Sequence, residues 1–168
     1  MSHFTTPAAA SPAADGRHAF DFFIGRWKVA YHRLRERLVS DTHWEDFAGA
    51  CETRHIIGGL GNLDDNVLEL PAGAYRAATL RLFNPATGLW SIWWIDARDC
   101  TLGAPVHGRF VDGVGTFLGE DQLGSRLIKV RFVWSNITPR SARWEQAFSA
   151  DGGESWEQNW RMDFARAD

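Results

Sequence analysis

The sequence predicts an all-β protein: a single antiparallel up-and-down β-barrel of about nine or ten strands with a short N-terminal helix. After residue 25, short segments rich in β-branched and aromatic residues alternate with turn residues. Most of the turns are short, so neighbouring strands are expected to pair antiparallel, and closing the sheet removes its exposed edges. The 168 residues fit one domain with a sizeable core.

The N-terminal part divides into a tail and a helix. Residues 1–14 are rich in Ala, Pro, Ser and Thr, a composition typical of a flexible tail. The barrel domain is then expected over residues 15–168. In the stretch DGRHAFDFFIG, Asp15 can cap a short helix and Gly25 can end it.

Ten strand-like segments follow the helix. Turn residues such as Gly58-Gly59, Asn84-Pro85 and Asp112-Gly113 separate them. The expected strands are Arg26–Leu34, Trp44–His55, Asn66–Leu70, Tyr75–Phe83, Leu89–Asp96, Val106–Phe110, Val114–Gln122, Arg126–Ser135, Ala142–Ser149 and Trp156–Ala165.

The last turn, SADGGESW over Ser149–Trp156, fits the pattern S-x-D-x-G-x-[ST]-W that recurs in sialidase propellers. A propeller needs several blades and therefore several copies of the motif, whereas this chain has one. Asp151 and the two glycines after it supply what a tight turn requires. The motif therefore indicates a structural hairpin and not a sugar-cleaving enzyme.

This hairpin also predicts a register. If Phe148 lies opposite Trp156, the inner face holds Trp144, Gln146 and Phe148 together with Gln158 and Trp160. The other face then carries charged and small residues, and a slip of one residue would mix the two faces.

Composition excludes several classes of partner. The net charge is −3 and no Lys or Arg run is present, which argues against nucleic acid. No apolar run reaches the roughly 18–20 residues of a membrane helix, and the N-terminus does not read as a signal peptide. Two cysteines form no disulfide framework, so we expect reduced thiols and a cytoplasmic protein.

Several segments together indicate a family. Gly25-Arg26-Trp27 resembles the G-x-W signature of lipocalins, in which the Trp closes one end of the barrel. Further matching segments are Arg54–Asn62, Thr79–Thr87, Trp90–Trp94, Trp144–Ser149 and Ser149–Trp156. Over about residues 18–166 the chain thus resembles a family of bacterial lipocalin-like proteins, of the calycin type, catalogued as a domain of unknown function. The resemblance implies a calycin barrel and brings no catalytic residue.

The expected function is non-covalent binding of a small, largely apolar ligand in an aromatic-lined barrel cavity. Nine tryptophans are available for its walls. Aromatic walls and polar anchors together give the candidate ligand-binding residues Trp27, Tyr31, Arg33, Arg81, Trp93, Trp144, Gln146, Gln158 and Trp160. The polar members of this set can instead satisfy one another at a barrel end, and which side of Arg81's strand faces inward stays open.

Other readings stay open beside the binding protein. One is an enzyme acting on a small hydrophobic molecule in the same cavity, with Glu45 and Asp46 beside His43, or Glu145, as acid or base. No nucleophile elbow or P-loop supports catalysis, and no residue is assigned a catalytic role. Another is an interaction module whose core is filled, and an outward Trp in Trp93-Trp94 is consistent with a homodimer.

Metal and cofactor chemistry has little support in the sequence. The six histidines are scattered and show no metal-ligand spacing. We therefore expect no metal and no cofactor, with haem bound through a single His as the alternative.

Overall fold

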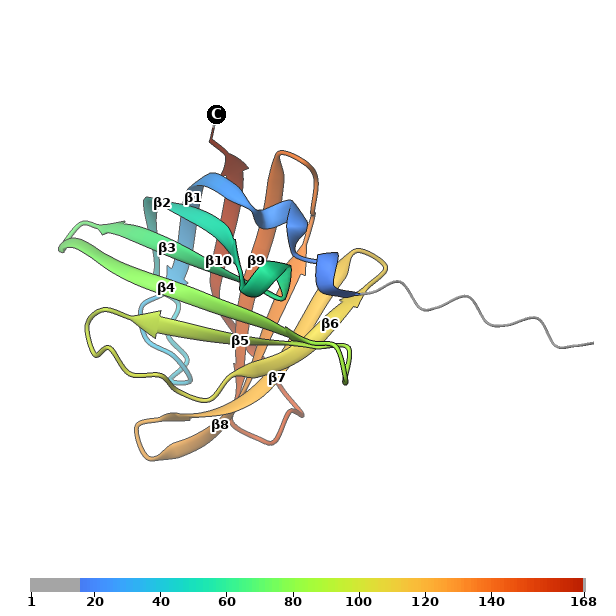
Figure 1. Ribbon diagram of the computed structural model, residues 1–168. Helices are drawn as coiled ribbons and strands as arrows, with labels where there is room; N and C mark the ends of the chain where they lie inside the picture. Colours follow the sequence, from blue (N-terminus) through green and yellow to red (C-terminus); the bar gives the residue numbers. More distant parts are fainter. Residues whose placement is uncertain (1–15, 168) are drawn as a thin grey trace, which may run out of the picture.

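The computed structural model describes residues 16–167 and shows a closed barrel of ten antiparallel strands (Figure 1). Each strand pairs with its neighbours in sequence, and the last strand pairs with the first. The predicted fold class, an up-and-down barrel, is therefore confirmed. The predicted tail over 1–14 and the predicted helix cap at Asp15 lie outside the described residues.

The strands agree with the expected segments to within a few residues at most ends, and the third strand begins five residues earlier than expected, at Gly61. They are Gly25–Leu34 (β1), Trp44–Ile56 (β2), Gly61–Leu70 (β3), Gly73–Asn84 (β4), Leu89–Asp96 (β5), Val106–Val111 (β6), Val114–Leu123 (β7), Arg126–Ser135 (β8), Ser141–Ser149 (β9) and Glu157–Arg166 (β10). A short 3₁₀ turn, Ile57–Gly59 (η3), joins β2 to β3.

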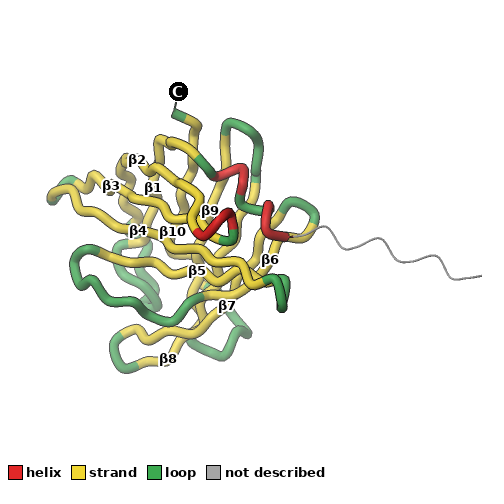
Figure 2. Tube along the Cα trace, in the orientation of Figure 1, coloured by secondary structure: helices red, strands yellow, loops and turns green. Residues whose placement is uncertain are grey.

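The N-terminal helix is not continuous. Where one helix over residues 15–25 was expected, the chain forms two separate 3₁₀ turns, Gly16–His18 (η1) and Asp21–Phe23 (η2) (Figure 2). The tighter turn places residues three apart above one another. Phe20 and Phe23 have this spacing, and both are fully buried in the barrel end. Packing of these two rings therefore favours the 3₁₀ geometry over an α-helix.

The two ends of the barrel differ because hairpin connections alternate between them. The N-terminal turns cross one end, near β6 and β9 (Figure 1). There the Nε1–H of Trp27 donates to the Phe23 carbonyl at 2.8 Å, and the two rings stack at 5.4 Å. The connections β1–β2, β5–β6 and β7–β8 lie at the opposite end, which we call the mouth.

The inner face follows the predicted alternation. On β1, Trp27, Val29 and Tyr31 are buried, and on β8 the same holds from Ile128 to Trp134 at every second residue. Gly49 on β2 lets the Tyr31 ring pack against the backbone, because a Cβ there would lie 2.7 Å from the ring. The core is therefore built mainly of aromatic side chains.

In the described part of the chain, no helix is long and apolar enough to cross a membrane.

The predicted register of the last hairpin was wrong by one residue at the turn. Phe148 lies opposite Glu157 and not Trp156, and the register shifts again between Gln158 and Trp160. This β-bulge adds one residue to β10. As a result Trp160 returns to the inner face, whereas Gln158, which we expected inside, is exposed.

The Asp-box turn has the structural role that the sequence indicated. Asp151 accepts hydrogen bonds from the Ser149 hydroxyl at 2.7 Å and the Ser155 N–H at 3.0 Å. Together with the Ser155 hydroxyl, these donors hold the pKa of Asp151 well below its usual range. The Nε1–H of Trp156 closes the turn by donating to the Gly153 carbonyl at 3.1 Å.

Replacing Asp151 with Ala should lower stability in a pH-dependent way. A depressed pKa stabilises the fold above the ordinary value of 3.8, and the benefit falls as the pH drops toward the lower folded value. Urea unfolding should therefore show a larger difference between wild type and Asp151→Ala at neutral pH than at about pH 2.5. Glu154→Ala, an exposed carboxylate in the same turn, is the control. A difference independent of pH would contradict this account of the turn.

Candidate functional site

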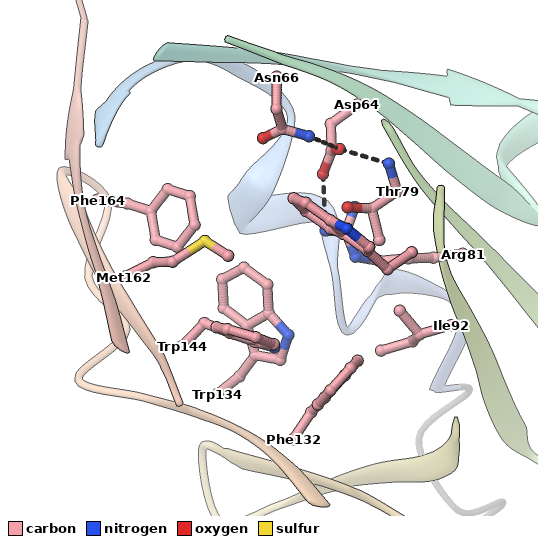
Figure 3. A pocket seen from close by; sticks show the side chains of 11 residues that line it. Asp64, Asn66, Thr79, Arg81, Ile92, Phe132, Trp134, Trp144, Met162 and Phe164 are labelled. Atoms are coloured by element: carbon pink, nitrogen blue, oxygen red, sulfur yellow. Dashed lines mark hydrogen bonds and ion pairs between the residues drawn. The ribbon is translucent and has the colours of Figure 1, made fainter. Parts of the chain in front are cut away.

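The half of the barrel next to the N-terminal turns, which we call the closed half, is almost completely filled. It leaves a deep pocket of about 20 Å³, room for about one water molecule. Figure 3 shows Phe164 and Met162 on one side of this pocket and Arg81 and Ile92 on the other. The full lining is Asp64, Asn66, Thr79, Arg81, Ile92, Trp94, Phe132, Trp134, Trp144, Met162 and Phe164.

Arg81 lies inside the barrel, which settles the orientation of its strand. Its guanidinium forms a buried ion pair with Asp64 at 2.7 Å and donates to the Asn62 side-chain oxygen at 2.9 Å. The rings of Phe23 and Trp134 lie against its Cζ, with centroids at 5.0 and 5.6 Å. The charge of Arg81 is therefore already neutralised by the protein itself.

Asp64 holds the neighbouring strand as well. One oxygen accepts the backbone N–H of Thr79 at 2.8 Å and the side-chain amide of Asn66 (Figure 3). This network ties β3 to β4 inside the barrel, where an unpaired carboxylate would be very costly. The deep pocket is thus a structural site.

A larger cavity of about 400 Å³ opens at the mouth. Its floor consists of apolar side chains from five strands. These are Ile92, Trp94, Val106, Val130, Phe132, Trp144, Phe148 and Trp160. Trp160 is the centre of the aromatic group, because the rings of Trp94 and Trp144 both meet it edge-on at 5.4 and 5.6 Å.

Three arginines stand at one side of this cavity. Arg33 donates to the Tyr75 hydroxyl at 3.1 Å, and Arg98 pairs with Asp96 through two bonds of 2.9 and 2.7 Å. Arg37 lies on the connection between β1 and β2. Burial, followed by the charge of Arg33, lowers the pKa of Arg37. Glu45 also lies 3.9 Å from Arg33, so this side of the mouth gathers three guanidinium groups together with carboxylates.

Further acidic residues line the rim. Asp99 belongs to the β5–β6 connection, and Glu120 and Asp121 belong to the end of β7. All three are exposed. Asp99 lies next to Arg98 and acts on its charge, whereas Glu120 and Asp121 come from a different strand.

The structure brings four of the predicted residues together at the mouth. Arg33, Trp144, Gln146 and Trp160 line the large cavity. Gln146 is held by Asn159, the residue that the bulge turns inward, through a bond of 2.9 Å from its Nε2. Their role in binding a ligand stays a prediction.

Other predicted residues lie elsewhere. Arg81 lines the deep pocket. Trp27 and Tyr31 are buried but line neither cavity: Trp27 closes the barrel end, and Tyr31 stacks on Phe47 at 4.8 Å. They support the barrel wall without reaching the mouth.

Two predicted positions need correction. Gln158 lies on the outer face and donates to Glu145 at 2.9 Å, because the bulge follows it. Trp93 also lies on the outer face, since its neighbours Ile92 and Trp94 both line the cavities and adjacent strand residues point to opposite sides. Trp94 is thus the inward residue of the pair. Its alternation with Trp90 and Ile92 could have identified it from the sequence.

The candidate acid–base residues do not line either cavity. His43 bonds to Asp41 at 2.7 Å and Asp46 bonds to His32 at 2.6 Å, all on the surface. Burial raises the pKa of the Cys51 thiol well above its usual value, so this thiol is a packing residue. Among residues 16–167, no three His, Cys, Asp or Glu side chains come together as metal ligands.

Neither a protein-family model nor a curated protein matches the sequence. A solved structure, the S-type phycobiliprotein lyase CPES from Guillardia theta, has a similar fold with a TM-score of 0.60. The match covers 94% of this chain and 99% of that one at 9% sequence identity. It confirms the lipocalin-like fold alone. The predicted membership in a bacterial family stays a prediction.

Arg81→Met should destabilise the protein strongly, because it leaves the Asp64 carboxylate buried without its partner. We expect a loss of about 3–5 kcal/mol in the free energy of unfolding, measured by urea denaturation. Arg76→Met is the matched control, since Arg76 and Asp65 form an exposed pair on the outer face of the same two strands. Its loss should stay within about 1 kcal/mol. Equal losses in the two variants would contradict a structural role for the buried pair.

Proposed function

We propose that the protein binds a small molecule with a flat, largely apolar body, non-covalently, in the cavity at the mouth of the barrel. The observation that carries this proposal is the cavity itself. Its volume of about 400 Å³ falls within the range of roughly 300–1,000 Å³ that small-molecule sites occupy. The interior of the closed half leaves only about 20 Å³, so a ligand inside the barrel is confined to the mouth. The other space of similar volume, about 380 Å³, is an open groove on the outer face of β5–β7.

The floor suits an aromatic or conjugated ligand. Trp94, Trp144 and Trp160 present ring edges and faces from three different strands, and such surfaces bind flat molecules by burying large apolar areas. Arg33 and Gln146 stand beside this floor and provide polar contacts that can fix the orientation of a ligand.

The structural neighbour adds limited support. It is named as a phycobiliprotein lyase, so a barrel of this fold serves a pigment-bearing protein there. A bilin-type pigment is accordingly one candidate ligand for the present barrel. The proposal extends to binding and not to catalysis.

The cysteines agree with a cytoplasmic location for this binding protein. Cys51 is buried and Cys100 is exposed, and both are free thiols. Free thiols persist in reducing compartments.

Blocking the mouth should abolish binding without affecting the fold. Ala104 is exposed and lines the cavity, so Ala104→Trp should fill part of it at little cost in stability. We expect the affinity for the neutral fluorescent probe N-phenyl-1-naphthylamine to fall by about tenfold or more. Ala86→Trp, an exposed alanine in the turn at the closed end, should leave affinity unchanged. Equal binding by wild type and Ala104→Trp would place the binding elsewhere and refute the proposal.

A further inference from the structure

Arg37 differs from the other arginines of the mouth in having no hydrogen-bond or ion-pair partner among the described residues. Arg33 and Arg98 are held by Tyr75 and Asp96, whereas Arg37 forms no ion pair or hydrogen bond with any of residues 16–167. Its Nε–H is buried all the same. Buried donors in folded proteins are almost always paired, so this guanidinium calls for an acceptor that the described chain does not supply.

The charges around Arg37 define what that acceptor must be. Arg33 and Arg98 lie near Arg37 as like charges, and Glu157 lies near it as an opposite charge. The Glu157 carboxylate is already engaged, because it accepts the Leu38 N–H at 2.9 and 3.1 Å. The Arg37 guanidinium therefore has no direct acceptor among the described residues, and an anionic group forms the strongest hydrogen bonds with such a donor.

Trp160 provides a second unsatisfied donor at the same place. Its Nε1–H is buried and has no partner among the described residues. The Cζ atoms of Arg33 and Arg37 lie 5.3 and 6.0 Å from its ring centroid. The indole thus forms part of the cavity floor close to two guanidinium groups.

The segment that carries Arg37 is fixed in advance. Asp41 accepts the backbone N–H groups of Glu36 and His43 at 2.9 and 3.0 Å. Hydrogen bonds from His43 lower the pKa of Asp41 to about 2. Because Glu157 also holds Leu38, little ordering of this connection is needed on binding.

We propose that Arg37 binds an acidic group of the ligand, a carboxylate or an equivalent oxyanion, while the ligand's apolar body lies on Trp160. This inference rests on the proposed function and specifies its ligand class: aromatic or conjugated acids, which bind more tightly than neutral molecules of the same shape. The exposed carboxylates of Glu120 and Asp121 on the rim repel the same group. The acidic group of the ligand is therefore expected beside Arg37.

Two dyes of nearly the same shape test this inference. 1-Anilinonaphthalene-8-sulfonate carries an acidic group, and N-phenyl-1-naphthylamine is the same skeleton without it. A charge-assisted hydrogen bond corresponds to about 10- to 100-fold in affinity. Fluorescence titration of Arg37→Gln should therefore show a loss of this size for the sulfonate dye and no change for the neutral dye.

Arg35→Gln is the matched control, because Arg35 belongs to the same connection, is 67% exposed and does not line the cavity. It should bind both dyes as wild type does. Arg37 forms no ion pair or hydrogen bond with residues 16–167, so the midpoint of thermal unfolding of Arg37→Gln should stay close to that of the wild type.

The outcomes separate the two proposals. If Arg37→Gln changes the affinity for neither dye, or weakens both equally, the acidic-group inference is overturned while the mouth cavity stands as a binding site. If the wild type binds neither dye, or Ala104→Trp binds both as wild type does, the proposed function fails, and this inference fails with it.

Discussion

The buried ion pair between Arg81 and Asp64 is the constraint on which the rest of the barrel depends. The two groups lie 2.7 Å apart and are almost completely buried. Each charge is tolerated there only because the other is present. The rings of Phe20, Phe23 and Trp134 pack around the guanidinium, so the pair fixes the N-terminal turns as well as β3 and β4. The residues inside the closed half of the barrel therefore have a structural role.

The mouth has the complementary character. Its aromatic floor comes from strands that hydrogen-bonding fixes on both sides, whereas Arg37, Arg98 and Asp99 come from the connections or from residues next to them. Proteins commonly place recognition residues on connections and support them with rigid strands or helices. The fold therefore allows ligand specificity to change at the rim without altering the core.

Much of this arrangement follows from the sequence, because strand periodicity decides which face a residue occupies. Trp144 and Trp160 were placed inward correctly on that basis. Gln158 was not, because a bulge between Gln158 and Trp160 leaves no clear trace in the alternation. Arg37 could not be found at all, since no periodicity governs a connection and its significance depends on Arg33 and Trp160, which are distant in sequence.

The most direct test of the central claim is a crystal structure of the protein in complex with 1-anilinonaphthalene-8-sulfonate. We expect the naphthalene to lie on Trp160 inside the mouth and the sulfonate to contact the Arg37 guanidinium. A dye bound instead in the shallow outer groove near Val111, Val114 and Leu118, with the mouth empty, would contradict both the site and the role of Arg37.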